Sequence, residues 1–417
     1  MEFNYQLIND CIFDIFTSYQ HDCYFLFQLS LISSKISSFF HSLKHIKINY
    51  SEISILNKFL SLQSIDIFSS NMDNSKYLEC SRLKDLTNLT SLRLGDSFMI
   101  ENISCLTLLQ KIELDICDYR LRYFYTCTNL VFLTYLKSNT NGYVSYFDRL
   151  TNLKYFKGLL HEIDVNFNHC KSLEYLNVEF ILAGNLLFDV FELKHLTHVK
   201  LASSISGQVK CNNINFNTNL RILKMFHINI INLDVRPFLF LEKLTLHQLI
   251  SIDGIIISGL NHLKKLYLHN IETIRIYSLT SLLRLKISQI QILTFMGNFG
   301  NLTHLTINNV RIFPESLRIT SLKKLSTDYY NSNMYRNLEV DFDGVENCKI
   351  KNLPIFELSN MTNLTSLSVK SNCFLSLNLT HMKYLRKLTI LYSMKNLKVN
   401  KIVDVMKIRD DMIIEHE

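Results

Sequence analysis

Tryptophan is absent from this chain of 417 residues, and proline (3 residues) and glycine (10 residues) are scarce. A chain this poor in glycine and proline is not expected to contain long flexible linkers. The chain also lacks a glycine-rich phosphate-binding loop, a G-x-S-x-G nucleophile turn and any C-x-x-C pair. These are common signatures of nucleotide-binding, hydrolytic and zinc-binding proteins. We therefore predict no enzymatic activity, no cofactor and no metal site.

The chain also has only a small excess of basic over acidic residues. There are 44 Lys and Arg residues against 37 Asp and Glu, a net charge of +7, which is low for a nucleic-acid-binding protein of this length. The 10 cysteines are scattered, as in proteins of reducing compartments. The first residues, MEFNYQLINDCIFDIF, lack the basic start of a secretory signal. We expect a cytoplasmic protein, with the nucleus as the alternative, and no membrane segment.

One phrase recurs through almost the whole chain. It reads LTNLTSLRL at 86–94, with apolar residues at steps of three, three and two, and returns as LNHLKKLYL (260–268) and LTSLLRLKI (279–287). If the first apolar residue is position 0, the others fall at positions 3, 6 and 8. Clear starts lie at 40, 59, 86, 106, 127, 150, 170, 193, 217, 238, 260, 279, 299, 319, 361 and 382. Such a period is typical of a solenoid, whose units bury a core only by stacking.

This repeat resembles that of the leucine-rich repeat family over residues 40–400. The resemblance implies an α/β-type repeat solenoid of about 16 short coils, in an arc with a parallel sheet on its concave side. The family usually has Asn, Cys, Ser or Thr three residues after the last apolar strand position, but five coils depart from this pattern, at Ile181, Leu249, Ile271, Ile290 and Val310. Several coils return through β-branched segments such as IETIRI (271–276) and IQILTF (290–295), which favour extended or 3₁₀ structure on the convex side.

The segment 326–353 interrupts the rhythm with polar and acidic residues. The gap between the starts at 319 and 361 equals two periods, and Leu338, Val340 and Phe342 fit one distorted unit within it. The alternative is a loop that projects from the solenoid. We expect solvent rather than a cation around the acidic residues Asp341, Asp343 and Glu346. Residues 401–417 form a C-terminal cap or tail.

Residues 1–39 precede the repeats and carry two apolar phrases, LINDCIFDIF (7–16) and FLFQLSLISSKISSFF (25–40). These phrases resemble the F-box, a small helical adaptor-binding module, although Ile8 stands where that family has proline. Under this resemblance the contacts to an Skp-type adaptor come from Leu7, Ile12, Ile15, Phe16, Leu29 and Ile32. The alternative is that residues 1–39 only cap the first coil.

Together the two resemblances imply a specific role. An F-box-like segment followed by leucine-rich repeats is the arrangement of substrate-recognition subunits of cullin–RING ubiquitin ligases of the Skp/cullin/F-box type. Such a protein belongs to the ubiquitin-like conjugation pathway and holds its protein target on the concave face. The alternative is a leucine-rich repeat scaffold or regulatory subunit in signalling, with no ubiquitin link.

Side chains at positions 5 and 7 flank the buried position 6 and are expected to point outward from the concave sheet, because strand side chains alternate. In this frame we predict partner-binding residues at Tyr155, Lys157, Tyr175, His198, Lys200, Lys224, Lys243, Lys265, Tyr267, Arg284, Lys286, His304 and Lys324. Phe226, His247 and His269 follow at position 9. This composition favours a docking strip for an acidic or phosphorylated protein segment. The alternative is that the lysines only solvate the outer face.

Nucleic-acid binding and zinc binding are two further functions that the sequence supports less well. Single-stranded nucleic acid is the competing polyanion, but the chain has no arginine-rich run. His195 and His198 form an H-x-x-H pair, yet the frame places His198 outward on a strand and His195 in the preceding turn. No cysteine or carboxylate follows at the spacing of zinc ligands, so we predict no zinc site there.

Overall fold

The computed structural model of this chain describes two compact units. Unit 1 comprises Met1–Ala183 and Leu187–Leu196, and unit 2 comprises Gly184–Leu186 and Thr197–Glu417. The described residues are 44–49, 56, 61–68, 76–78, 83–95, 98–100, 103, 105–114, 126–135, 147–160, 167, 169–181, 184–186, 193–204, 209–211, 219–230, 233–249, 254–297, 299–312, 319, 321–328, 344–351, 361–370, 376–390, 396–399, 404–407 and 413–416.

The repeated phrase folds as a tight turn followed by a short strand. In the coil that starts at residue 238, Phe238, Leu241 and Leu244 have no exposed surface. The amide of Leu241 donates a 3.0 Å hydrogen bond to the carbonyl of Phe238, which closes the turn and explains the spacing of three. The strand then alternates buried and outward residues. The apolar positions predicted from the sequence therefore form the core of each coil.

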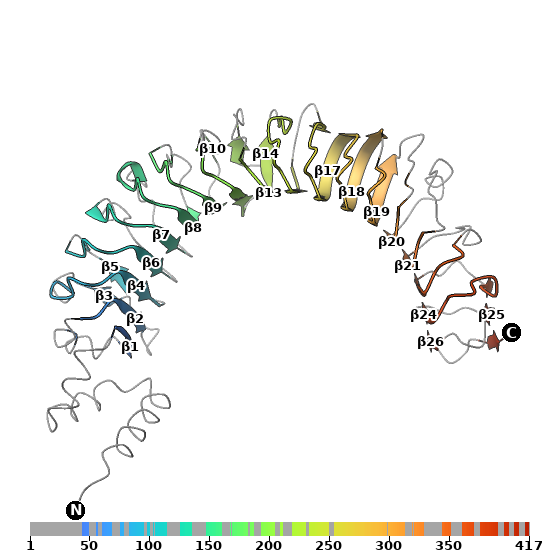
Figure 1. The fold of residues 1–417 in the computed structure, drawn as a ribbon, viewed down its shortest axis with the longest axis horizontal. Helices are drawn as coiled ribbons and strands as arrows, with labels where there is room; N and C mark the ends of the chain where they lie inside the picture. The colour runs from blue at the N-terminus through green and yellow to red at the C-terminus, as the bar shows by residue number, and fades with distance from the viewer. Residues whose placement is uncertain are drawn as a thin grey trace, which may run out of the picture. The chain divides into compact units, whose positions relative to one another are not determined.

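Unit 1 contains one main sheet of parallel strands in chain order (Figure 1). Its strands are β1 (His45–Asn49), β2 (Ser64–Phe68), β4 (Ser91–Leu94), β6 (Lys111–Leu114), β7 (Phe132–Tyr135), β8 (Tyr155–Leu160) and β9 (Tyr175–Phe180). A second, small parallel sheet pairs β3 (Lys76–Leu78) with β5 (Phe98–Ile100). A 3₁₀ turn, η4 (Phe147–Arg149), precedes β8.

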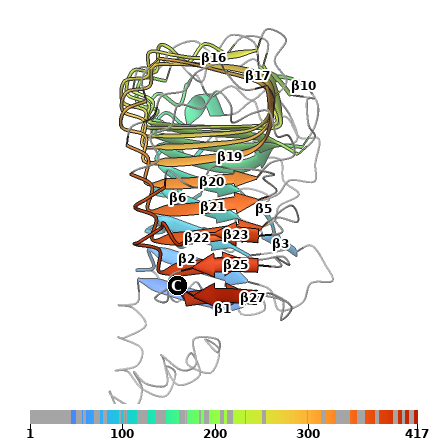
Figure 2. The ribbon, with the colours of Figure 1, turned by 90° about the vertical axis from the view of Figure 1, so that its right-hand side faces the viewer.

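Unit 2 repeats this plan, and Figure 2 shows its main strands β19 to β22 one beside the next. Its main strands are β11 (His198–Ser203), β13 (Ile222–Phe226), β15 (Lys243–His247), β17 (Lys265–Tyr277), β18 (Arg284–Met296), β19 (His304–Ile312), β20 (Lys324–Asp328), β21 (Asn347–Lys351), β22 (Ser366–Lys370), β24 (Lys387–Ile390) and β26 (Asp404–Lys407). Each pairs in parallel with the next.

Short return strands form a second layer in unit 2. They are β10 (Gly184–Leu186), β12 (Val209–Cys211) and β14 (Ile228–Ile230) in one sheet, and β23 (Ser376–Asn378), β25 (Asn396–Val399) and β27 (Ile413–His416) in another. A further return strand, β16 (Ile255–Ile257), pairs with the second half of β17. The expected extended returns at 271–276 and 290–295 are therefore confirmed. Strands β26 and β27 carry both layers into residues 401–417.

Helices do not contribute to the described part of either unit. The described residues contain strands, turns and 3₁₀ segments but no α-helix. The α/β-type class expected from the sequence is therefore wrong for this part of the chain, which is a parallel β-solenoid. The predicted helical segment 1–39 lies outside the described residues. The count of about 16 coils stays a prediction, because several inter-strand segments also lie outside them.

A left-handed residue turns the chain in five successive coils of unit 2, directly after β13 and β15 and within the longer strands β17, β18 and β19. These residues, at position 10 of their coils, are His227, Gln248, Asn270, Gln289 and Asn309, with φ between 49° and 60°. The position that follows holds a buried apolar residue, such as Leu249 or Ile271, each 2% exposed. The apparent departures from the family pattern at Leu249, Ile271, Ile290 and Val310 are therefore core residues placed by a left-handed corner.

The Asn and Thr residues of the T-N-L-T phrase join neighbouring coils. The side-chain amide of Asn301 donates to the carbonyl of Thr280 at 2.7 Å, and Asn152 donates to Thr128 in the same way at 3.0 Å. The hydroxyl of Thr303 donates to the carbonyl of Leu283 at 3.0 Å. The two asparagine bonds satisfy turn carbonyls, and the threonine bond adds to the backbone bonds that the carbonyl of Leu283 accepts from the amides of Thr303 and His304. The phrase thus has a structural role beyond its leucines.

The irregular segment 326–353 contains a regular strand. In β21, Cys348 pairs with Leu325 of β20 on one side and with Leu367 of β22 on the other, which gives intervals of 23 and 19 residues. The distorted unit expected at Leu338, Val340 and Phe342 lies outside the described residues. Residues 347–351 therefore form a regular strand of the main sheet, and the distorted unit stays a prediction.

The cysteines differ in their chemical state. Cys127, Cys170 and Cys348 are buried free thiols, as expected for residues that replace leucine in the core. Burial raises the pKa of the Cys127 thiol to about 11 and that of Cys348 to about 12, so both are unreactive at neutral pH. Cys105, in contrast, is disulfide-bonded. This disulfide differs from the free thiols that the scattered cysteines suggested.

Candidate functional site

The outward side of the main sheet of unit 2 carries a cluster of six cations. Parallel pairing places Lys243, Lys265 and Arg284 directly beside one another at position 5 of β15, β17 and β18. Position 7 places Lys200 beside Lys224 on β11 and β13, and Lys286 beside Tyr267 on β18 and β17. We call Lys200, Lys224, Lys243, Lys265, Arg284 and Lys286 the basic face. Adjacent parallel strands lie about 4.8 Å apart, so these charges are close neighbours.

The charges of the basic face are not neutralised by acidic side chains. Within the described part of the chain, no carboxylate forms an ion pair with any of the six cations. Partial burial lowers the pKa of Lys243, and the nearby charges of Lys224 and Lys265 lower it further. Like charges on adjacent strands repel one another unless something offsets them. Among the described residues, the basic face therefore keeps a positive charge that no ion pair compensates.

Two histidines at the margins of the basic face have pKa values that are lowered by burial and by neighbouring cations. Burial is the main cause of the lowered pKa of His198, followed by the charges of Arg221 and Lys224. His304, beside Arg284 and Lys324 in the register, also has a pKa lowered by burial and then by these two cations. Both imidazoles are therefore neutral at neutral pH. Lys324 follows His304 in the same position-5 row.

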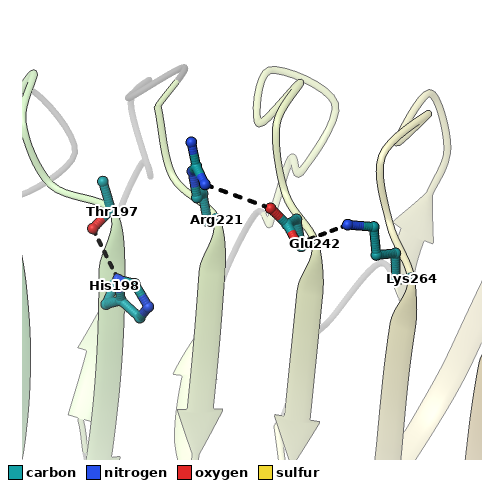
Figure 3. A network of polar contacts seen from close by, with 5 residues as sticks. All are labelled: Thr197, His198, Arg221, Glu242 and Lys264. Carbon is teal, nitrogen blue, oxygen red and sulfur yellow. Dashed lines mark hydrogen bonds and ion pairs between the residues drawn. The ribbon is translucent and has the colours of Figure 1, made fainter.

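Acidic residues lie instead along position 4, at the start of the strands. Glu242 accepts from Lys264 at 3.0 Å and lies 3.8 Å from Arg221 (Figure 3). The hydrogen bond from Lys264 lowers the pKa of Glu242. Glu346, from the acidic cluster predicted at 341–346, pairs with Lys323 at 3.5 Å in the same row. These pairs are exposed and contribute little stability, but they offset part of the positive charge of the position-4 row beside the basic face.

Aromatic rings lie beneath two of the six cations of the basic face. The ammonium of Lys243 is 5.3 Å from the centre of the Tyr267 ring, and that of Lys200 is 5.7 Å from the centre of Phe226. The rings of His227, His247 and His269 stack at position 9 and the adjoining corner, with the last two 4.3 Å apart. Sequence reasoning placed the rings near the lysines but did not foresee this stacking, which depends on lateral neighbours from different coils.

The predicted residues Tyr155, Lys157 and Tyr175 belong to unit 1. Tyr155 stacks between Phe132 and Tyr175 in the register of β7, β8 and β9, at ring separations of 4.2 Å and 4.3 Å. Burial is the main cause of the raised pKa of Tyr155, with Tyr175 as the next contributor. Lys157 lies beside Asn177. These residues form an aromatic column in unit 1, whereas the basic face belongs to unit 2.

The remaining predicted site residues lie elsewhere. Leu7, Ile12, Ile15, Phe16, Leu29 and Ile32 are outside the described residues. His198 accepts from or donates to the hydroxyl of Thr197 at 2.8 Å (Figure 3), while His195 is exposed in the preceding turn, as the sequence frame predicts. Among the described residues, no group of three or more His, Cys, Asp or Glu side chains is arranged to hold a metal ion, and no helix has the length and apolarity to cross a membrane.

Comparison with known proteins identifies the fold. No family model and no curated protein matches the chain. Among solved structures, it is similar to a leucine-rich repeat protein of Leptospira interrogans, with 13% identity over 92% of this chain and 98% of that one, and a TM-score of 0.45. It is also similar to the functional domain of InlJ from Listeria monocytogenes, with 15% identity over 88% of this chain and 76% of that one, and a TM-score of 0.43.

A third similarity is to TLR13 in its complex with the RNA ssRNA13. It has 16% identity, covers 87% of this chain and 59% of that one, and has a TM-score of 0.50. The parallel main sheet, the repeated turn and this similarity agree, so the solenoid has the fold of leucine-rich repeat proteins.

Proposed function

We propose that this protein is a non-catalytic binding scaffold that holds an acidic segment of another protein on the basic face of unit 2. The observation that carries the proposal is the row of Lys243, Lys265 and Arg284 on adjacent strands, with no carboxylate partner among the described residues. A paired sheet holds these charges at fixed spacing before binding, which lowers the entropy cost of recognition. Complementary charge also speeds association.

Single-stranded nucleic acid is the second candidate, because the structure of the similar protein TLR13 contains RNA. Proteins that bind single strands without sequence preference stack bases on exposed aromatic faces. On the basic face, however, Lys243 lies over Tyr267 and Lys200 lies over Phe226. These rings already have cationic partners, so the arrangement favours an acidic protein segment over a nucleic acid.

Charge reversal tests this proposal. The triple variant Lys243→Glu, Lys265→Glu, Arg284→Glu is expected to weaken binding of an acidic peptide pool by at least about 100-fold, since attraction becomes repulsion at three adjacent positions. Fluorescence anisotropy at fixed salt measures the change. The matched control is Lys264→Glu, Lys323→Glu, Arg386→Glu, which reverses the same residue types on the position-4 row. Equal binding by both variants would show that the basic face only solvates the sheet.

We further propose that this scaffold is the substrate-recognition subunit of a cullin–RING ubiquitin ligase. The support is the F-box-like sequence of residues 7–39, which lie outside the described residues. The function requires an intracellular protein, in the cytoplasm or the nucleus. Three of the described cysteines are free, as this compartment requires, whereas the disulfide at Cys105 is more typical of an oxidising compartment. A scaffold in signalling without a ubiquitin link is the alternative.

Adaptor binding separates these two roles. The wild-type protein is expected to co-purify with an Skp-type adaptor, and the variant Ile15→Asp, Ile32→Asp is expected to lose it, because charges replace two apolar contacts. The control is the basic-face triple variant, which should retain the adaptor. If the wild type fails to bind the adaptor, residues 1–39 are a cap and the ligase role is wrong. The scaffold proposal is unaffected by that result.

A further inference from the structure

A hollow of about 560 Å³ lies on the basic face between strands β13 and β18. This volume is in the usual range of ligand pockets. The hollow forms because Thr245, in the middle of the position-7 row, is much smaller than its neighbours Lys224 and Tyr267. Its lining consists of Lys224, Phe226, Lys243, Thr245, Leu246, His247, Tyr267, Leu268, His269 and Lys286.

Three ammonium groups border this hollow from different sides. Lys224 comes from β13, Lys243 from β15 and Lys286 from β18, and no acidic residue is part of the lining. Strands β13 and β18 are separated by two others, so the backbones of Lys224 and Lys286 lie about 14 Å apart across the hollow, and Lys243 lines it from a strand between them. Cations that surround one point suit a compact anion of high charge. Cations in a straight row would suit an extended polyanion instead.

Two histidines at position 9, His247 and His269, line one side of the hollow and supply uncharged hydrogen-bonding groups. The stacked imidazoles of His247 and His269 have pKa values lowered chiefly by burial. For His247 the next causes are His269 and His227, and for His269 they are Lys286 and His227. Both rings are therefore neutral at neutral pH, and each has one N–H group to donate.

Two polar atoms at the floor of the hollow lack partners. Among the described residues, the buried hydroxyl of Thr245 and the buried Nδ1 of His247 have no hydrogen-bond partner. A buried polar atom without a partner destabilises the fold by about 1–3 kcal/mol, so such an atom in a native structure calls for a specific reason. Rotation of the Thr245 side chain about χ1 would turn this hydroxyl toward an anion bound in the hollow and give it a partner.

We infer that the hollow binds the phosphate of a phosphorylated serine or threonine side chain of the partner. This inference rests on the proposed function and specifies its ligand. A phosphate monoester carries up to two charges and three acceptor oxygens, which match three lysines and the neutral donors better than a carboxylate does. Phosphotyrosine fits less well, because its ring would need an open aromatic surface, and Lys243 and Lys200 already lie over Tyr267 and Phe226.

The test compares three acidic peptide pools with randomised flanks and a fixed central residue: phosphoserine, glutamate or serine. Binding to the full chain is measured by fluorescence anisotropy. The phosphoserine pool is expected to bind at least about 10-fold more tightly than the glutamate pool, which corresponds to one extra charge-assisted hydrogen bond. The variant Lys224→Gln, Lys286→Gln should remove this preference, and Lys264→Gln, Lys323→Gln should retain it.

A second variant separates a role in binding from a role in the fold. Thr245→Val keeps the shape of the side chain and removes the unpartnered hydroxyl. We expect it to lower the affinity for the phosphoserine pool several-fold while raising the melting temperature, since a buried unsatisfied group is lost. If the residue were merely structural, the affinity would not change.

The outcomes distinguish the inference from the proposed function. Equal affinity for the phosphoserine and glutamate pools would overturn the phosphate site and leave the acidic-segment scaffold intact. Binding of none of the pools would overturn both. Tighter binding of an oligouridylate than of the phosphoserine pool would assign the hollow to a nucleic acid and overturn the inference.

Discussion

Replacing Leu266 with alanine is expected to lower the free energy of unfolding of unit 2 by about 3 kcal/mol. Leu266 has no exposed surface and lies in register between Leu244 of β15 and Leu285 of β18. Each coil of a solenoid buries its core only against its neighbours, so a cavity here weakens two interfaces at once. Urea unfolding followed by circular dichroism gives the change in free energy.

The matched control is Lys265→Ala, one residue earlier on the same strand. Lys265 is exposed and points outward, so its loss should change the free energy of unfolding by less than about 0.5 kcal/mol. Similar effects of the two substitutions would contradict the assignment of position 6 to the core and position 5 to the outer face. The assignment of the basic face depends on that alternation.

Replacing Phe156 with alanine is expected to cost about 4 kcal/mol in unit 1. Phe156 is fully buried, and its ring centre lies 5.1 Å from that of Phe147 and 5.1 Å from that of Phe167. The substitution removes one ring of this three-ring cluster, together with its edge-to-face contact with Phe147. Large aromatic residues bury more area than leucine, so the loss should exceed that of Leu266→Ala.

Amide hydrogen exchange shows which strands are destabilised by Phe156→Ala. Amide exchange is expected to accelerate in β7, β8 and β9 of the Phe156→Ala variant, with no change in β17 and β18, because solenoid coils contact only their neighbours. Lys157→Ala, the adjacent outward substitution, serves as the control and should leave exchange unchanged. Uniform acceleration along the whole chain would contradict a stack of locally stabilised coils.

Most of the coil geometry could be predicted from the sequence, because periodic apolar residues report directly on burial. The spacing at Phe238, Leu241, Leu244 and Leu246 gives the turn, the strand and the buried side of the strand together. The β-branched segment 271–276 likewise predicts an extended return. These features depend on residues close together in the chain, so a single sequence contains the information.

The corners of the coils could not be predicted in the same way. Leu249 and Ile271 appeared to depart from the family pattern, whereas they are core residues that follow a left-handed Gln248 and Asn270. The sequence does contain a signal for these corners, because a polar residue directly precedes Leu249 and Ile271. Its meaning depends on backbone conformation, because Asn adopts positive φ at modest cost whereas Gln is not a typical residue there.

The candidate site was predicted in part. Alternation along each strand identified the outward lysines, and the parallel register confirms that Lys243, Lys265 and Arg284 are lateral neighbours. The hollow was not foreseen, because it depends on a small Thr245 surrounded by large side chains from neighbouring coils. Such lateral relations require a register between strands, which repeat counting alone gives only approximately.

The central claim is that the basic face of unit 2 contacts the acidic partner, and lysine footprinting tests it most directly. The full chain is treated with an amine-acylating reagent with and without the bound acidic peptide pool, and the modification of each lysine is measured by mass spectrometry. We expect binding to protect Lys243, Lys265 and Lys286, while Lys264 and Lys323 on the position-4 row react as before. Unchanged reactivity of the first three lysines in the peptide-bound protein would contradict the account.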